Sequence, residues 1–297
     1  MPGSANFASR AFCCKIKNMK FSFKNRSLEC DRTKIVGILN VTPDSFSDGG
    51  LHFSPDLAVK HALEMLENGA DIIDIGGESS RPGAEPVSDA EEIRRIEPVI
   101  SALKSLRPNL IISVDTAKVS VAKVVLEAGA DIINDIGGLR NSEDLANTVS
   151  KFGAGVILMH MRGTPATMRN FCVYDNLIEE ICSDLNESVR IATNAGIPRE
   201  NIVIDPGIGF AKNHLQNLEI VANAIRFTSN EFPVMFGHSR KSFLGDITGA
   251  MTPSDRVPAT VAATFWLAMN KVQFIRVHDV AQNLQAVKMA NAISGVK

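Results

Sequence analysis

The sequence predicts an α/β protein: a single (β/α)8 (TIM) barrel preceded by an N-terminal β-hairpin. The chain has 297 residues, and such barrels typically take about 250. Eight short runs rich in Val and Ile alternate with amphipathic segments of helical length. This alternation indicates right-handed βαβ crossovers and a parallel sheet, which eight units close into a barrel. An open doubly wound sheet is the alternative, disfavoured because no GxGxxG motif follows the first strand.

The expected elements follow one another along the whole chain. Residues 1–20 are expected to be a leader, residues 21–34 a hairpin, and residues 35–297 one barrel domain. The expected strands are residues 35–40, 71–76, 111–115, 131–134, 155–160, 201–205, 233–237 and 273–278. The expected helices are residues 55–68, 90–106, 118–128, 142–152, 177–195, 215–227, 260–271 and 281–293.

An internal similarity supports the repeated architecture. Residues 67–77 read ENGADIIDIGG and residues 127–138 read EAGADIINDIGG. The two copies are offset by two βα units, and in each a glycine ends a helix before the next strand begins. The similarity indicates shared local geometry and assigns no function.

Composition excludes several classes of function. A formal net charge of −2 and a pI near 6.3 argue against nucleic acid as a partner. No apolar run approaches the roughly 18 residues of a membrane-spanning helix, so no membrane partner is expected. The cysteines are unevenly spaced, with neither a zinc pattern nor a disulfide framework. A reducing cytoplasm is the expected compartment.

The first 28 residues carry six Lys or Arg and no Asp or Glu. This composition is compatible with an organellar transit peptide, but it lacks the apolar centre of a secretory signal. A remnant of recombinant expression explains the first four residues equally well. We therefore treat the segment as a leader followed by an edge hairpin.

Polar residues follow every predicted strand. They are Asn40, the 76–81 loop, Asp115 and Thr116, Asn134 and Asp135, His160, Asp205, the 237–241 loop, and Arg276, His278 and Asp279. The carboxyl ends of barrel strands share one face, where barrel enzymes have their active sites. Each residue alone could instead cap the next helix, but all eight positions together predict a site at this rim.

Two kinds of chemistry are expected there. Arg276 and His278 lie two apart on one strand and, with Arg81, form a cationic group suited to a phosphate or pyrophosphate. An internal salt bridge for Arg276 and a structural role for His278 are the alternatives. Asp115, Asp205 and Asn134 offer acceptors for a flat heterocycle rich in N–H groups, to which Lys241 adds a donor. A metal site is the competing idea, but no HExxH-like spacing supports it.

Strand parity separates Met159 from its neighbour His160. We expect Met159 to point inward over an aromatic ligand and His160 to face the helix layer in a structural role. No GxSxG motif or cysteine partner motif is present, so catalysis is expected to rest on positioning and electrostatics rather than on a covalent enzyme intermediate.

Eight motifs of the chain resemble those of the dihydropteroate synthase family. They are GILNVTPDSFSDGG (37–50), DIGGESSRPG (74–83), SVDT (113–116), INDIGG (133–138), LMHMRGTP (158–165), DPGIGF (205–210), HSRKSFLG (238–245) and RVHD (276–279). They span essentially the whole chain after residue 34 and are specific as a set. Many relatives carry Thr at the position of Ser80, which keeps the hydroxyl and adds a methyl.

The resemblance implies a condensation in folate biosynthesis. The pyrophosphate ester of 6-hydroxymethyl-7,8-dihydropterin reacts with 4-aminobenzoate to give 7,8-dihydropteroate and pyrophosphate. Pyrophosphate leaves first, and the arylamine attacks the resulting pterin methylene cation. The resemblance further implies Mg²⁺ as cofactor, sulfonamides as inhibitors and a homodimer as the assembly.

The family pattern also implies roles for single residues. The residues implied to bind the pterin are Asp115, Asn134, Met159, Asp205 and Lys241. The residues implied to bind pyrophosphate are Asn40, Ser80, Arg81, Arg276 and His278. The side-chain carbonyl of Asn40 is also implied to bind Mg²⁺. The residues implied to bind 4-aminobenzoate are Phe46, Pro82 and Ser242. The implied catalytic residues are Asp48, Arg81, Lys241, Arg276 and His278, and the loops that carry Phe46, Asp48 and residues 80–82 would close as a lid.

Two other functions remain open. A methyltetrahydrofolate:corrinoid methyltransferase shares the pterin contacts but has little use for a pyrophosphate site. A catalytically silent pterin-binding homologue would have lost lid or cationic residues, and none is missing here.

Overall fold

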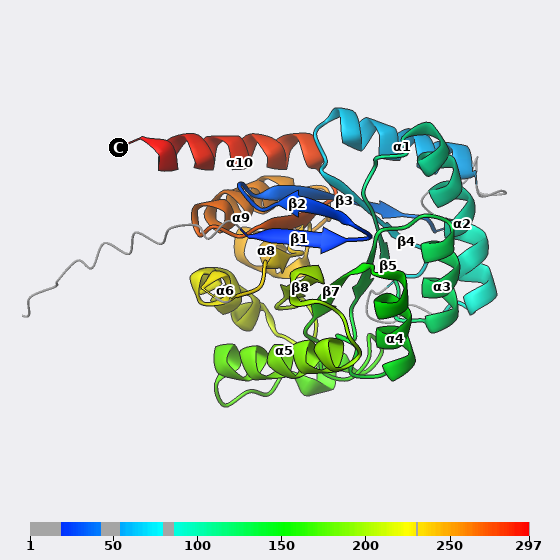
Figure 1. Ribbon diagram of the computed structural model, residues 1–297. Coiled ribbons are helices and arrows are strands. Elements are labelled where there is room, and N and C mark those ends of the chain that lie inside the picture. Colours follow the sequence, from blue (N-terminus) through cyan, green and yellow to red (C-terminus); the bar gives the residue numbers. More distant parts are fainter. Residues whose placement is uncertain (1–18, 43–53, 80–85, 230, 297) are drawn as a thin grey trace, which may run out of the picture.

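The computed structural model describes residues 19–42, 54–79, 86–229 and 231–296 (Figure 1). Within these ranges, eight parallel strands form one sheet in the order β8-β7-β6-β5-β4-β3-β10-β9. A bridge between Ile204 of β8 and Val234, next to β9, joins the two ends. The predicted (β/α)8 barrel with its N-terminal hairpin is therefore confirmed.

The barrel strands are β3 (Lys34–Asn40), β4 (Ile72–Gly76), β5 (Ile112–Asp115), β6 (Ile132–Asp135), β7 (Gly155–Met159), β8 (Ile202–Asp205), β9 (Met235–Phe236) and β10 (Phe274–Val277). The helices are α1 (Pro55–Glu67), α2 (Asp89–Leu106), α3 (Val119–Glu127), α4 (Glu143–Phe152), α5 (Leu177–Asn194), α6 (His214–Ala222), α7 (Ala224–Thr228), α8 (Ser242–Thr248), α9 (Val257–Met269) and α10 (Val280–Gly295). Two short 3-10 helices, η1 (Met168–Phe171) and η2 (Arg199–Asn201), precede α5 and β8.

Two predicted helix assignments need correction. The helix expected over residues 215–227 is two helices, because Asn223 interrupts it as the C-cap of α6 and the N-cap of α7. Helix α8 was not expected at all; it starts at Ser242, directly after Lys241, and ends at Gly249 in a left-handed conformation with φ 76°. Short helices of this kind have too few residues for a clear apolar period.

Side chains on the barrel strands alternate between two apolar regions. Residues such as Ile35, Leu39 and Ile73 belong to the large core between the sheet and the helix layer. Their neighbours Val36 and Ile72 point into the barrel and form a separate cluster with Ile132, Ile157, Val203, Met235 and Phe274. The period of two along a strand fixes which residues can reach the barrel axis.

The hairpin closes the barrel at the amino-terminal ends of its strands. Strands β1 (Lys20–Phe23) and β2 (Arg26–Glu29) pair antiparallel, and Phe21 and Phe23 are buried in the barrel cluster. The Phe21 ring lies 5.8 Å from that of Phe274 in an edge-to-face arrangement. A Cβ at Gly155 would lie 2.6 Å from Phe21, so any larger residue at this strand position would displace the buried Phe21 ring. Within the described residues the hairpin covers this end, which leaves the carboxyl-terminal end of the barrel for a ligand.

Of the described residues, none belongs to a helix that combines the length and the apolar character needed to cross a membrane.

Candidate functional site

A polar network fills the barrel interior above the apolar cluster. The Arg276 guanidinium donates through Nε to Asp74 Oδ2 at 2.5 Å and through Nη2 to Asp115 Oδ2 at 3.0 Å. Asn134 Nδ2 donates to the same Asp74 oxygen at 3.1 Å. In the sheet, neither β6 nor β10 is a neighbour of β4, so these bonds cross the barrel interior and tie four strands together.

Asp74 is the member of this network that sequence reasoning missed. Its side chain is fully buried, and its second oxygen, Oδ1, has no hydrogen-bond partner among the described residues. A charged residue between Ile73 and Ile75 of a predicted central strand was the available signal, because parity places it with Ile72 on the interior face. Buried carboxylates are uncommon unless they are paired.

Both predicted carboxylates of the heterocycle site have raised pKa values. Burial raises the pKa of Asp115 to about 7, against the opposing effect of the Arg276 cation. Burial also raises the pKa of Asp205, while the backbone N–H of Gly207, 2.7 Å from Oδ1, acts in the other direction. Desolvation penalises the charged form of a carboxyl group, so ligand N–H groups that replace the lost water would stabilise these anions.

Lys241 reaches the same region from the loop before α8. Its Nζ donates to the carbonyl of Ile208 and lies 4.5 Å from the centroid of the Phe210 ring. Burial lowers its pKa to about 8, although the Asp205 carboxylate pulls the pKa upward. The lysine therefore approaches its neutral form at mildly alkaline pH, and its capacity to donate depends on pH in that range.

The predicted opposite orientation of Met159 and His160 is confirmed. Met159 is buried in a small apolar cluster with Met161, Met168, Phe210 and Ala211. His160 faces outward, with Nε2 3.0 Å from Asp184 Oδ2 on α5 and Nδ1 2.9 Å from Lys212 Nζ. Burial lowers the pKa of His160 to about 4, so the ring is neutral; because the Asp184 carboxylate can only accept, Nε2 carries the proton and Nδ1 accepts from Lys212 Nζ.

Lys212 fixes the loop that follows β8. Its buried Nζ also contacts the carbonyl oxygens of Gly207 and Phe210 at 3.0 and 2.9 Å. The same loop supplies the Ile208 carbonyl and the Phe210 ring that contact Lys241. His160 and Lys212 thus hold the loop that in turn positions Lys241.

Asn40 and His278 lie at the carboxyl ends of β3 and β10, which are neighbours in the sheet. Asn40 ends β3 opposite Gly76, and a Cβ at Gly76 would lie 3.9 Å from Asn40 Oδ1 and 3.7 Å from Asp115 Cβ. His278 Nδ1 lies 3.0 Å from the Ser239 hydroxyl. Arg276 and His278 therefore both make the internal contacts that were the alternative to a free cationic group.

The remaining predicted site residues are placed as follows. Ser242 is the exposed first residue of α8. Phe46, Asp48, Ser80, Arg81 and Pro82 lie outside the described residues. The described part of the chain contains no cluster of three or more His, Cys, Asp or Glu side chains that could hold a metal ion.

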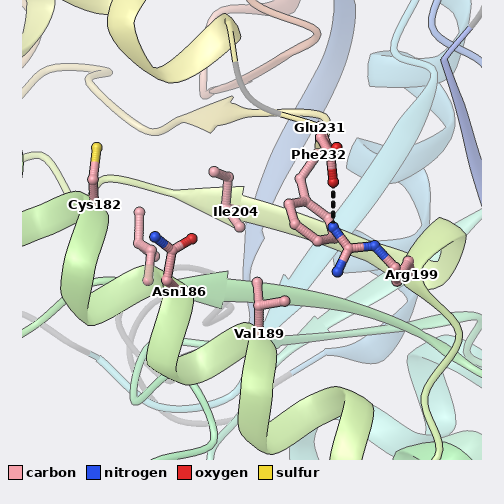
Figure 2. A pocket seen from close by; sticks show the side chains of 8 residues that line it. Cys182, Asn186, Val189, Arg199, Ile204, Glu231 and Phe232 are labelled. Atoms are coloured by element: carbon pink, nitrogen blue, oxygen red, sulfur yellow. Dashed lines mark hydrogen bonds and ion pairs between the residues drawn. The ribbon is translucent and has the colours of Figure 1, made fainter.

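A separate pocket lies in the helix layer beside α5 (Figure 2). Its walls include Leu185, Ile204 and Phe232, and the Arg199–Glu231 ion pair crosses its edge at 2.6 Å. None of the predicted site residues lines it. The barrel interior therefore remains the candidate site.

Comparison with known proteins identifies the family. The chain matches the family model "Pterin binding enzyme" over residues 36–278. It is 46% identical over 264 residues to dihydropteroate synthase of Clostridium beijerinckii, which covers 89% of this chain and 95% of that protein. The chain belongs to the pterin-binding enzyme family.

Solved structures agree with this assignment. Dihydropteroate synthase of Yersinia pestis in a sulfonamide complex superposes with a TM-score of 0.87 at 40% identity, covering 94% of this chain and all of that one. The Xanthomonas albilineans dihydropteroate synthase with 4-aminobenzoic acid gives a TM-score of 0.88 at 40% identity, covering 95% of this chain and all of that one.

The depressed pKa of Lys241 can be measured directly. In protein labelled with ¹³C at lysine Cε, the Lys241 signal should titrate near pH 8, well below the ~10.4 of an ordinary lysine. That signal should vanish in Lys241→Met and persist in Lys60→Met, which removes an exposed lysine on α1. A Lys241 signal that titrates above about pH 10 would show that burial does not set its pKa.

Proposed function

We propose that this chain is a dihydropteroate synthase. It would join the pyrophosphate ester of 6-hydroxymethyl-7,8-dihydropterin to 4-aminobenzoate, giving 7,8-dihydropteroate and pyrophosphate. The proposal rests on one observation. The barrel mouth brings together a cation and a set of polar side chains, namely Arg276 with Asp115, Asp205, Asn134 and Lys241. Relatives named dihydropteroate synthase, at up to 46% identity among those compared, support it.

The pterin ring would bind to Asp115, Asn134, Asp205 and Lys241. Its ring N–H and amino groups are donors, and the carboxylates and the Asn134 carbonyl can accept them. Lys241 would donate to the ring carbonyl or to a ring nitrogen. Met159, buried in a cluster with Phe210 and in register with Asp205, would supply an apolar contact for the flat ring.

The pyrophosphate would bind to Asn40, Ser80, Arg81, Arg276 and His278. Cationic side chains at this position stabilise the negative charge that develops on the departing oxygen. Mg²⁺ fits the Asn40 side-chain carbonyl, a hard oxygen at the end of β3. When bound, the ion would neutralise pyrophosphate charge and complete its coordination with phosphate oxygens and water.

The reaction would proceed by dissociation and capture. The C–O bond to pyrophosphate breaks and its electron pair leaves with the oxygen, so a cation forms on the pterin methylene carbon. The amine nitrogen of 4-aminobenzoate then forms the C–N bond and loses a proton. Asp48 and the loops around it would exclude water that could otherwise capture the cation.

The second substrate would lie above the pterin, against Phe46, Pro82 and Ser242. The Xanthomonas albilineans structure contains 4-aminobenzoic acid and the Yersinia pestis structure a sulfonamide drug. We propose that sulfonamides compete for the same place in this chain. The methyltransferase alternative finds less support, because it leaves the pyrophosphate residues without a role.

We further propose that the enzyme is a cytoplasmic homodimer. The cysteines that the structure describes, Cys30, Cys172 and Cys182, are free thiols, which suits a reducing compartment. Large apolar side chains such as Trp266, Met289 and Ile293 are about half exposed on α9 and α10, helices that pack against each other. Exposed apolar groups of this kind are typical of an interface.

The assembly can be tested by sedimentation velocity at micromolar concentration. We expect a species of about twice the 32.1 kDa chain mass, because burial of these apolar groups favours association. Trp266→Glu should shift it toward monomer, whereas Arg94→Ala, on an exposed surface of α2, should not. A monomeric wild-type chain would contradict the proposal.

The activity is tested with the purified chain, dihydropterin pyrophosphate and 4-aminobenzoate. Mass spectrometry should detect dihydropteroate and pyrophosphate in equal amounts, and removal of Mg²⁺ with EDTA should suppress both products. Readdition of Mg²⁺ should restore them. A folded protein that binds the pterin ester but yields no product would favour the silent homologue.

Arg276→Ala tests the place of the leaving group. We expect turnover to fall on the order of 10²-fold, or ~2.7 kcal/mol, by analogy with the loss of one preorganised donor to a developing anion. Arg94→Ala removes an exposed arginine and should retain wild-type turnover. Circular dichroism shows whether both variants are folded, and near-normal turnover in folded Arg276→Ala would mean that the leaving group binds elsewhere.

A further inference from the structure

Arg276 is already paired with carboxylates in the ligand-free protein. One edge of its guanidinium faces Asp74 through Nε and the far end faces Asp115 through Nη2. Two acidic side chains therefore already bind the Arg276 guanidinium, one of the cationic groups that the proposed function assigns to pyrophosphate. An anion that enters alone has to compete with Asp115 for this cation.

The two carboxylates differ in their access to a ligand. The Asp74 side chain is fully buried, whereas that of Asp115 is 15% exposed at the carboxyl end of β5. A ligand in the barrel mouth can reach Asp115 but not the Asp74 oxygen that holds Nε. The Arg276 end bound to Asp74 is thus fixed, and the end bound to Asp115 is exchangeable.

Asp74 also orients the amide of Asn134. A carboxylate only accepts hydrogen bonds, so the Asn134 group 3.1 Å from Asp74 Oδ2 is its NH₂. The carbonyl oxygen of Asn134 then remains for a donor of the ligand. Asp74 Oδ2 therefore positions two groups: the Asn134 carbonyl, an acceptor for the heterocycle, and the Arg276 guanidinium, a donor for the anion.

We infer that Asp74 is a positioning residue that anchors Arg276 while its Nη2 exchanges between Asp115 in the empty site and the pyrophosphate group in the loaded site. Donors of the heterocycle occupy Asp115 and release Nη2, so the ring and the diphosphate bind with positive coupling. This inference rests on the function proposed above. It adds that each half of the substrate prepares the site for the other.

The expected size of the effect follows from thermodynamic linkage. Coupling between two ligands of one site typically amounts to 5–150-fold in affinity and is reciprocal. We expect the pterin to tighten pyrophosphate binding by at least about fivefold, and pyrophosphate to tighten pterin binding by the same factor. If neither ligand disturbs the Arg276–Asp115 pair, the affinity for pyrophosphate with pterin bound should equal the affinity without it.

Isothermal titration calorimetry on the full chain measures this factor. Inorganic pyrophosphate with Mg²⁺ is titrated into the protein with and without saturating 6-hydroxymethyl-7,8-dihydropterin, which lacks the diphosphate. Wild-type protein that binds both ligands independently overturns the exchange and leaves the proposed function intact. Protein that binds neither ligand overturns both.

Two variants act in opposite directions. Asp115→Asn removes the negative charge that holds Nη2 at nearly constant volume. We therefore expect pyrophosphate alone to bind several-fold more tightly than to wild type, while pterin binding weakens. The exchange requires this gain to depend on Arg276, so an unchanged or weaker affinity in folded Asp115→Asn, or the same gain in an Arg276→Ala background, contradicts the exchange.

Asp74→Asn removes the anchor charge at nearly constant volume. The pterin-dependent gain in pyrophosphate affinity should fall to within about twofold of unity, because Arg276 no longer has a fixed end. Ser113→Ala is the matched control: Ser113 is buried on β5 in register with Asp74, and its hydroxyl has no hydrogen-bond partner among the described residues. It should retain the wild-type coupling, and wild-type coupling in folded Asp74→Asn would refute the anchor.

Discussion

The buried ion pair between Arg276 and Asp74 is the interaction on which the site depends. A carboxylate without water in a barrel interior is costly unless a cation and hydrogen bonds compensate it. Arg276 and Asn134 provide that compensation from β10 and β6, strands that are not neighbours of β4. The same contacts therefore stabilise the closed barrel and position polar groups at its mouth. Replacement of this network by apolar side chains would preserve packing but remove the site.

A second layer of support lies behind the β8 loop. Lys212 holds the backbone of Gly207 and Phe210 and receives its own orientation from His160. Burial lowers the pKa of His160 to about 4, so the imidazole is neutral at physiological pH and can accept a hydrogen bond from Lys212 Nζ. This arrangement keeps the loop in the one conformation that presents the Ile208 carbonyl and the Phe210 ring to Lys241. A site with several charged side chains requires such rigid support, because a small displacement changes every electrostatic interaction in it.

Much of the fold could be read from the sequence because its signals are local. Runs of Val and Ile with regular spacing gave the strand number and order, and strand parity separated Met159 from His160. The errors arose where tertiary contacts override local pattern. Helix α8 and the break at Asn223 are short features whose position depends on the packing of α6, α8 and α9. Strand β9, with only Met235 and Phe236, is held mainly by its neighbours.

The sequence by itself determined the barrel class, the rim on which polar residues gather, and the resemblance to a family. It determined these features because periodicity, strand ends and motifs are properties of neighbouring positions. Only the tertiary structure decided how the charges pair: Arg276 lies 202 positions from Asp74 and 161 from Asp115 in the chain, and no local pattern indicates which carboxylate a guanidinium will reach. The closure of the barrel determines this pairing. The interior is narrow and desolvated, so a charged side chain there is stable only when it pairs with an opposite charge that also faces the barrel axis.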